Sequence, residues 1–267
     1  MSEKQFPKIM GVLNVTPDSF SDGGKYFSVE SAINQGLKLI GEGADILDIG
    51  GESTRPDAVE VSPYEEIKRV IPVIEAIIKS EPGITISIDT TKSEVAEAAI
   101  NSGAKIINNV FGISHDESLS KLAAKYNTGL ILMHIQGTPR NMQKNPIYNN
   151  VVEDVFEELR NSIEFARSFG VQKIIADVGI GFGKTLEHNL ELLKNHKRFQ
   201  ELGVPLLLGL SRKSFIGKLL TIENTDDRDI PTALFYALLL DSGIDIIRVH
   251  NVELINILKK IYIALKD

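Results

Sequence analysis

Polar residues that could bind a ligand stand at the ends of eight apolar stretches of the chain. Each stretch is rich in β-branched residues and nearly continuous, a pattern typical of parallel strands buried on both faces. The residues at these ends are Asn14, Asp48, Asp89, Asn108, His134, Asp177, Ser211–Lys213, and Arg248 with His250. Eight polar strand ends in succession are hard to explain by chance. We therefore expect them to converge on one rim and to bind a ligand rich in polar atoms.

The residue types indicate two kinds of recognition at this rim. Carboxylate and amide groups on Asp89, Asn108 and Asp177 suit a planar heterocycle that carries amino and ring N–H groups. A cationic set suits an anionic group such as a phosphate, and its members are Lys213, Arg55, Arg248 and His250. The plainer alternative for Asp89 and Lys213 is a structural ion pair inside the rim.

Two patterns that resemble other ligand sites are rejected. Gly179–Thr185 resembles a phosphate-binding loop, but the pattern G-x-x-x-x-G-K-[ST] would need glycine at Val178. The chain has 5 histidines without zinc-binding spacing and no cysteine, which excludes thiolate metal sites, thiol catalysis and disulfides. Mg²⁺ remains compatible, because it needs only one or two protein oxygens in addition to substrate phosphates.

The elements that must position these residues alternate strictly between strand and helix. The expected strands are residues 9–14, 46–49, 84–89, 106–109, 130–134, 174–177, 206–210 and 246–249. Capping boxes at 62–65, 91–94 and 114–117 predict three of the helix starts.

Eight βα units with right-handed crossovers close most economically as an α/β (β/α)8 TIM barrel, which we expect to form a single domain over residues 1–267. An open doubly wound sheet is the alternative, but its usual G-x-G-x-x-G turn is missing after the first strand. Residues 14–28 and 49–62 predict extended loops after the first two strands, and residues 136–150 a third.

Composition narrows the class of protein further. The chain has 267 residues, with 29 basic and 36 acidic side chains and a net charge of −7. The acidic balance argues against nucleic acid as a partner. No stretch reaches the roughly 18 apolar residues of a membrane span, and residues 1–7 do not resemble a signal peptide. We therefore expect no membrane association and a cytoplasmic location.

At the polar strand ends the sequence closely resembles the dihydropteroate synthases, members of the pterin-binding enzyme family. The resemblance spans the chain from about Ile9 to the last helix. It is carried by Gly11–Gly24 (GVLNVTPDSFSDGG), Asp48–Pro56 (DIGGESTRP), Ile88–Thr90, Ile107–Asn108, Leu132–Arg140 (LMHIQGTPR), Gly179–Thr185, Gly209–Gly217 (GLSRKSFIG) and Arg248–His250. Many separate motifs in the right order make this resemblance specific.

The resemblance implies a transferase of folate biosynthesis, the enzyme class that sulfonamides target. The reaction would join 6-hydroxymethyl-7,8-dihydropterin pyrophosphate to 4-aminobenzoate, giving 7,8-dihydropteroate and pyrophosphate. It would proceed by dissociative departure of pyrophosphate, without a covalent enzyme intermediate. The family's fold is the TIM barrel that the periodicity predicts independently, and a homodimer through the late helices is implied by the resemblance alone.

The resemblance also assigns roles to matching positions. Asp89, Asn108, Asp177 and Lys213 would hold the pterin, and Asn14 would give its side-chain oxygen to Mg²⁺. Arg248 and His250 would bind the pyrophosphate, and Phe182 and Ser214 would flank the aminobenzoate. The second loop carries Thr54, Arg55 and Pro56. Phe20 and Asp22 lie on a first loop that would close over both substrates. Catalysis would fall to Asp89, Asp177, Lys213 and Arg55.

Three other functions are weighed against this one. Lys213 at a strand end could form a Schiff base in an aldolase, but Arg212 beside it and the Asn and Asp set have no obvious role there. A methyltetrahydrofolate methyltransferase has a similar pterin barrel, yet it lacks the Asn14 loop and Arg55. A non-catalytic pterin-binding protein would be marked by loss of Asn14, Arg55 or Arg248, and all three are present.

Overall fold

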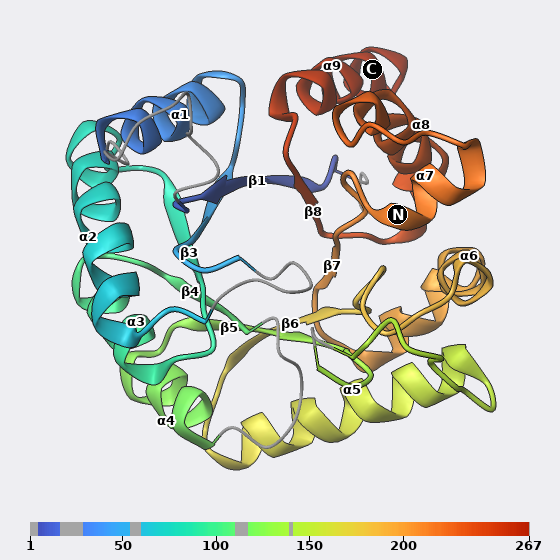
Figure 1. Ribbon diagram of the computed structural model, residues 1–267, viewed down its shortest axis with the longest axis horizontal. Helices are drawn as coiled ribbons and strands as arrows, with labels where there is room; N and C mark the ends of the chain where they lie inside the picture. Colours follow the sequence, from blue (N-terminus) through green and yellow to red (C-terminus); the bar gives the residue numbers. More distant parts are fainter. Residues whose placement is uncertain (1–4, 17–28, 54–59, 110–116, 139–140, 267) are drawn as a thin grey trace.

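The computed structural model describes residues 5–16, 29–53, 60–109, 117–138 and 141–266 of the chain. Within them, eight strands close one barrel in sequence order, and every neighbouring pair is parallel. The predicted (β/α)8 barrel is confirmed. Figure 1 shows the helices following one another around the outside of the strands.

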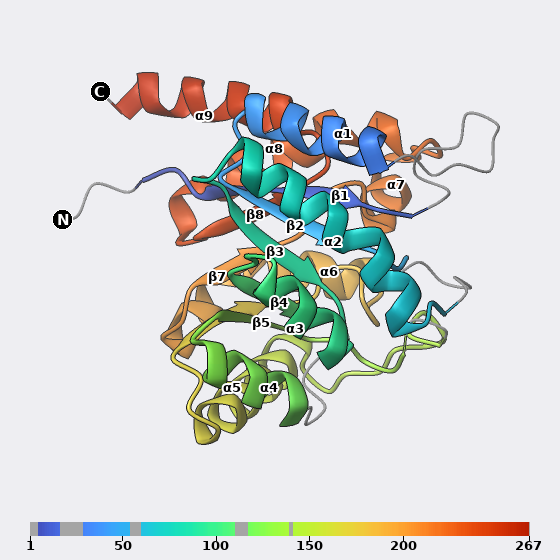
Figure 2. The same cartoon turned by 90° about the vertical axis from the view of Figure 1, so that its left-hand side faces the viewer.

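The strands begin and end within two residues of the expected positions. They are β1 (Lys8–Asn14), β2 (Ile46–Gly50), β3 (Thr85–Asp89), β4 (Ile106–Asn109), β5 (Gly129–Met133), β6 (Lys173–Asp177), β7 (Leu206–Leu208) and β8 (Ile246–Val249). In the side view of Figure 2, the arrowheads of β1 and β2 point to one end of the barrel, and α9 ends near the opposite one.

The helices form the outer layer. They are α1 (Val29–Gly41), α2 (Pro63–Ser80), α3 (Ser93–Asn101), α4 (Glu117–Tyr126), α5 (Val151–Ser168), α6 (Leu186–Lys194), α7 (Ser214–Leu220), α8 (Asp229–Leu239) and α9 (Val252–Lys266). Short 3₁₀ segments span His196–Leu202, Asp226–Arg228 and Leu240–Ser242. In the described part of the chain, no helix combines the length and apolar character that crossing a bilayer requires.

The helix start signals had mixed outcomes. Ser62 caps α2 as expected, because its side chain accepts the Glu65 N–H. The capping box expected at 91–94 is wrong: α3 begins at Ser93, and Lys92 makes no side-chain cap. The Lys92 ammonium instead pairs with the Glu52 and Glu66 carboxylates. The third expected box, 114–117, falls almost wholly outside the described residues, whereas Thr185 and His188 form a complete box that was not predicted.

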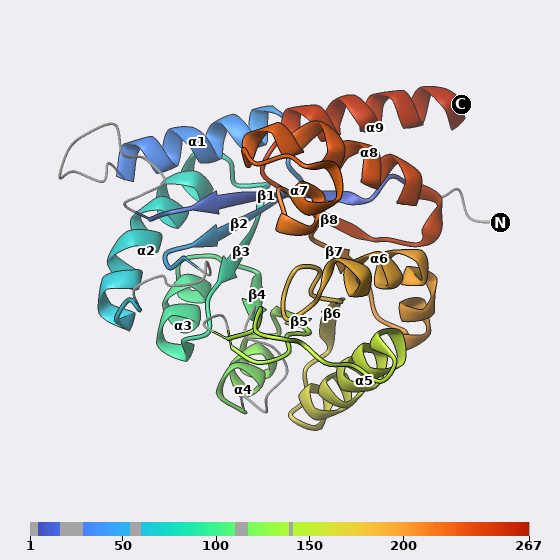
Figure 3. The same cartoon turned by 45° about the vertical axis from the view of Figure 1, so that its right-hand side comes forward.

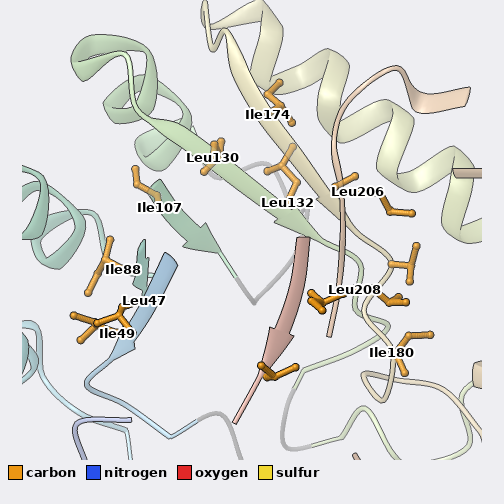
Figure 4. Packing of buried hydrophobic residues seen from close by; sticks show 14 of the residues in the cluster. Leu47, Ile49, Ile88, Ile107, Leu130, Leu132, Ile174, Ile180, Leu206 and Leu208 are labelled. Atoms are coloured by element: carbon orange, nitrogen blue, oxygen red, sulfur yellow. The ribbon is translucent and has the colours of Figure 1, made fainter. Parts of the chain in front are cut away.

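Two hydrophobic layers hold the barrel together. The larger layer lies between strands and helices, and Figure 4 shows alternate residues of single strands in it, such as Leu130 and Leu132 of β5. The smaller layer fills the barrel interior and consists of Met10, Ile46, Ile106, Ile131, Leu207 and Ile246. Because side chains alternate along a strand, the residue two positions after an interior residue also points inward, one layer nearer the carboxyl ends.

This two-residue step is what turns an apolar interior into a polar rim. Asp48 follows Ile46, Asn108 follows Ile106, and Arg248 follows Ile246. Pairing between strands sets Asp89 of the rim opposite Asn108, while Arg248 stands opposite Met10 of the interior layer. The alternation therefore places the rim residues directly next to the apolar layer that fills the barrel interior.

A buried tyrosine forms hydrogen bonds with the backbone at the end of β7. β7 has 3 residues and is the shortest strand of the described barrel. The Tyr236 hydroxyl of α8 accepts the Leu210 N–H at 3.0 Å and donates to the Leu208 carbonyl at 2.8 Å. These bonds join α8 to the backbone at the end of the short strand, and they fix the chain that leads to Ser211 and Lys213.

The long connections after β1 and β2 run from Asn14 to Val29 and from Gly50 to Pro63, as expected. Most of their residues lie outside the described part of the structure. A third long connection links β5 to α5, and its described residues contact the loop that follows β6.

Candidate functional site

One guanidinium joins two carboxylates at the carboxyl end of the barrel. Arg248 on β8 donates from Nε to Asp48 Oδ2 at 2.6 Å and from Nη2 to Asp89 Oδ2 at 2.8 Å. Asp48 is fully buried, and the side chains of Arg248 and Asp89 are 18% and 10% exposed. The ion pairs therefore connect β2, β3 and β8 across the barrel mouth, where water screens them little.

Asp48 was expected at the rim as a polar strand end, but sequence reasoning gave it no specific role. Its Oδ2 also accepts from Asn108 Nδ2 at 2.9 Å, so that one carboxylate orients both an amide and a guanidinium. Its second oxygen, Oδ1, is buried and has no hydrogen-bond partner among the described residues. An acidic residue inside a five-residue buried strand was the signal available in the sequence, because a buried charge requires a partner.

The crowded carboxylates shift the protonation of Asp89. Burial, and then the negative charge of Asp48, raise the pKa of Asp89 to about 7, although Arg248 opposes the shift. Burial alone would lower the pKa of Arg248, but Asp48 and Asp89 outweigh it, so the net pKa is raised and the guanidinium stays charged. Asp89 therefore changes charge within the physiological range.

Lys213 and Phe182 form a second part of the rim. Lys213 immediately precedes α7, and its ammonium lies 3.9 Å from the centre of the Phe182 ring. Burial, and then the charge of Arg248, lower the pKa of Lys213 to about 8, while Asp177 and Asp89 oppose the shift. Phe182 packs with Met133 and Met142, so the aromatic ring forms a wall beside the cation.

Asp177 ends β6 and is held by the loop that follows it. Its Oδ1 accepts the Gly179 N–H at 2.8 Å. Burial raises the pKa of Asp177, and the Gly179 N–H, Lys213 and Arg248 oppose the rise.

His250 is neutral, which corrects its expected place among the cationic donors. Burial, followed by the charges of Arg248, Arg212 and Lys213, lowers the pKa of His250 to about 3. The Ser211 hydroxyl accepts the His250 backbone N–H at 3.1 Å and lies 3.0 Å from ring Nδ1. A neutral imidazole carries one N–H, so His250 offers a hydrogen bond to a ligand without a positive charge.

Two of the polar residues at strand ends bind partners outside the rim. His134 is 1% exposed, and its Nε2 lies 2.8 Å from Glu158 of α5 while its Nδ1 contacts Lys184. Arg212 forms ion pairs with Asp229 and Asp226. The expectation that every strand end converges on one ligand is therefore wrong for these two residues. The ion pair weighed for Asp89 also differs, since its partner is Arg248.

The remaining predicted residues have mixed positions. Asn14 is the last residue of β1 and is half-buried, while Ser214 is the exposed first residue of α7. The structure brings together Asp89, Asn108, Asp177, Lys213 and Arg248 through direct contacts or mutual electrostatic effects. Thr54, Arg55, Pro56, Phe20 and Asp22 lie outside the described residues. All of the assigned roles stay predictions.

The donor set fits a hydrated Mg²⁺ better than a metal enclosed by protein. Among the described residues, no group of three or more His, Asp or Glu side chains could hold a metal ion. Asn14 offers one neutral carboxamide oxygen at the rim, and Mg²⁺ takes its other ligands from water and phosphate oxygens.

Comparisons with known proteins agree with this chemistry. The family model of the pterin binding enzymes matches residues 10–250. A dihydropteroate synthase of Clostridium beijerinckii is 46% identical over 246 residues, covering 91% of this chain and 88% of that protein. A dihydropteroate synthase of Haemophilus influenzae is 44% identical over 260 residues, covering 97% and 94% of the two chains.

Solved structures give the same result. A Xanthomonas albilineans dihydropteroate synthase with 4-aminobenzoic acid has a TM-score of 0.90 and 40% identity, covering 98% of this chain and 93% of that one. The structure from the same organism in complex with 7,8-dihydropteroate has a TM-score of 0.88 and 38% identity, covering 99% and 95%. The chain therefore belongs to the pterin-binding enzymes and, among them, to the dihydropteroate synthase family of transferases.

Proposed function

We propose that this chain condenses 6-hydroxymethyl-7,8-dihydropterin pyrophosphate with 4-aminobenzoate, releasing 7,8-dihydropteroate and pyrophosphate. The observation that carries the proposal is the rim itself, where Asp89, Asp177 and Asn108 stand beside Arg248 and Lys213 in a member of this family. We also propose that the chain works as one domain, because all its described strands close a single barrel. A cytoplasmic location is part of the same proposal.

The pterin is held by the acceptors and donors at the centre of the rim. The carboxylates of Asp177 and Asp89 accept hydrogen bonds from the amino and ring N–H groups of the heterocycle. Asn108, held by Asp48, supplies an amide whose orientation is fixed before the ligand arrives. The Lys213 ammonium donates to an acceptor of the ring.

The same carboxylates stabilise the charge that develops during the reaction. As the C–O bond to pyrophosphate breaks, its electron pair leaves with the anion, and positive charge develops on the pterin CH₂ group and spreads into the ring. Asp89 and Asp177 are fixed beside that charge before the reaction begins. Removing one such group typically costs about 3–4 kcal/mol of barrier. The departing anion is stabilised by Arg248, His250 and Arg55.

Mg²⁺ is the proposed cofactor at the pyrophosphate, with the Asn14 side-chain oxygen as its protein ligand. When bound, it neutralises negative charge on the leaving group. No protein nucleophile is required, because the amine of 4-aminobenzoate is already nucleophilic and attacks the CH₂ carbon. Phe182 provides an apolar wall for its ring, and its carboxylate lies near the N–H groups around Ser214. Thr54, Arg55 and Pro56, on the second loop, complete the proposed substrate site.

A homodimer through the late helices is also proposed, and exposed apolar residues support it. On α8, Ile230, Leu234 and Leu238 are 65%, 60% and 85% exposed and are spaced four residues apart. On α9, Ile257 and Ile261 repeat the pattern at 48% and 53% exposure. Figure 3 shows α8 beside α9 on the outside of the barrel, and a second copy seated on these two helices would cover both sets of exposed apolar residues.

The dimer is tested by molar mass in solution. Light scattering at micromolar concentration should give twice the 29.4 kDa of one chain. Replacing both Leu234 and Leu238 with Glu should give a mass near 29.4 kDa, because two charges would be buried at the contact. The control Ile147→Glu, at a position 69% exposed on the connection between β5 and α5, should leave the dimer intact. A monomeric parent chain would contradict the proposal.

The reaction is tested by turnover with both substrates and Mg²⁺, measured as release of pyrophosphate. Turnover that needs the pterin substrate, 4-aminobenzoate and Mg²⁺ together is expected. In the same assay Asn14→Ala should raise the Mg²⁺ concentration that gives half the maximal rate, and an unchanged titration would rule out the ligand role of Asn14. Tight pterin binding without any turnover would replace the proposed enzyme with a binding protein.

The pH dependence follows from the two titrating groups at the rim. As pH rises through about 7, Asp89 loses its proton and gains the charge that stabilises the transition state. Above about 8, Lys213 loses its charge. We therefore expect a bell-shaped profile of kcat/KM for the pterin substrate.

A matched pair of variants checks the assignment. Asp89→Asn should remove the acid limb and lower kcat/KM by roughly 10²–10³-fold. Asp227→Asn, at an exposed position, should retain the full profile. A parent profile that is flat between pH 5.5 and pH 7.5 would show that Asp89 does not control the rate.

A further inference from the structure

The loop between β6 and α6 folds around the ammonium of one of its own residues. Lys184 is 3% exposed, and its Nζ lies 2.9 Å from the Gly179 carbonyl oxygen, 2.9 Å from the Phe182 carbonyl oxygen and 2.8 Å from His134 Nδ1. The phosphate-loop resemblance of this stretch was rejected, yet the lysine at its end is a central contact of the loop. The proposed mechanism leaves this buried lysine without a role.

The number of acceptors matches a charged lysine. An ammonium has three N–H donors, and three acceptors stand within 2.9 Å of Lys184. The Glu158 carboxylate lies 2.8 Å from His134 Nε2, so the ring proton sits on Nε2 and Nδ1 of the neutral imidazole accepts. A neutral lysine amine has two N–H donors and would leave one of the three acceptors without a bond. The result is a chain of ammonium, neutral imidazole and surface carboxylate.

Other charges act on the same ammonium. Burial, together with the charge of Lys213, lowers the pKa of Lys184 to about 7, although Asp177 and Glu158 favour the charged form. Burial, and then the charge of Lys184, also lower the pKa of His134, which keeps that imidazole neutral.

The loop reaches this shape because glycines allow it. Gly179 and Gly183 have φ values of +66° and +62°. A Cβ at Gly179 would lie 1.8 Å from the His134 carbonyl oxygen, and one at Gly183 would lie 2.4 Å from that of Gln136. The backbone therefore packs tightly against the β5 loop while its carbonyls point to Lys184.

The same loop also contacts two residues of the proposed substrate site. The Gly179 N–H binds Asp177, and the Phe182 ring lies against the Lys213 ammonium. The two residues whose carbonyls bind Lys184 are thus the two that touch Asp177 and Lys213. A change at the ammonium would move both contacts together.

We propose that Lys184 is a positioning residue whose positive charge holds the 179–183 loop in the shape that places Phe182 and Asp177 for the reaction. This role rests on the function proposed above. The charge, rather than the bulk of the side chain, is what three acceptors require. Loss of a charged hydrogen-bond donor in a buried site should lower kcat/KM for 4-aminobenzoate by about 10- to 100-fold, chiefly through KM, because the aromatic wall is displaced.

The absence of cysteine from the sequence permits a test that changes only the charge. Lys184→Cys is unfolded in denaturant and alkylated with 2-bromoethylamine, which restores an ammonium on a side chain of lysine length. A second sample is alkylated with 1-bromopropane, which gives a neutral side chain of the same length. Both samples are refolded beside the parent chain, which has no thiol to react, and are assayed at pH 6.5, where the ammonium is populated.

The aminoethylated protein should recover kcat/KM to within about tenfold of the refolded parent, and the propylated protein should remain about 10- to 100-fold lower. Equal activity of the two alkylated proteins, with the parent active, would overturn the role of the charge alone. No turnover by the parent before or after refolding would overturn the proposed reaction and this role with it.

A surface variant keeps the inference testable if the alkylated proteins do not refold. Glu158 is 58% exposed, and Glu158→Ala should lower kcat/KM several-fold because the acceptor that holds the His134 proton on Nε2 is lost. The control is Glu157→Ala, whose carboxylate pairs with Arg160 on the same helix. Equal kcat/KM in the two variants would contradict the proposed chain of contacts.

Discussion

The site depends on one buried guanidinium that is shared by two carboxylates. Arg248 binds Asp48 and Asp89, and the bonds cross 200 and 159 residues of sequence. Breaking a buried pair by removing one partner typically costs about 3–5 kcal/mol, because the other charge is left without compensation. The relative positions of β2, β3 and β8 at the rim are therefore fixed together with the charges that a substrate would meet.

The remaining features of the site follow from this arrangement. Asp48 binds Asn108 as well as Arg248, and its negative charge contributes to the raised pKa of Asp89. The nearby charge of Arg248 in turn lowers the pKa of Lys213. A set of acceptors and donors held in this way before binding needs little reorganisation when charge develops on a ligand. The loop built on Lys184 then supplies the aromatic wall at one side.

Much of the fold and the position of the rim could be predicted from sequence, for identifiable reasons. The strands were recognisable because buried parallel strands are continuous apolar runs, and their polar ends marked the rim. Asp89, Asn108, Asp177, Lys213 and Arg248 were all found in this way. The alternation inside each strand was harder to see, since both faces are apolar, so the inward step from Ile46 to Asp48 was not used.

What could not be predicted depends on contacts between distant residues. A polar residue at a strand end can point to the rim or to a neighbouring helix, and only packing decides. His134 turned to Glu158, and Arg212 turned to Asp229. Lys92 was assigned to a capping box, but two carboxylates from other segments bind it instead. The charge of His250 also depends on surroundings that its own sequence neighbours do not reveal.

The central claim is that Asp48 and Asp89 share Arg248, and the titration of the Asp89 carboxyl carbon by ¹³C NMR tests it most directly. The signal is assigned by its loss in Asp89→Asn. The account predicts a midpoint near pH 7 in the parent chain and a clearly lower midpoint in Asp48→Asn, because the negative charge of Asp48 raises the pKa of Asp89. An Asp89 midpoint near 4 in the parent, or one that Asp48→Asn leaves unchanged, would contradict the account.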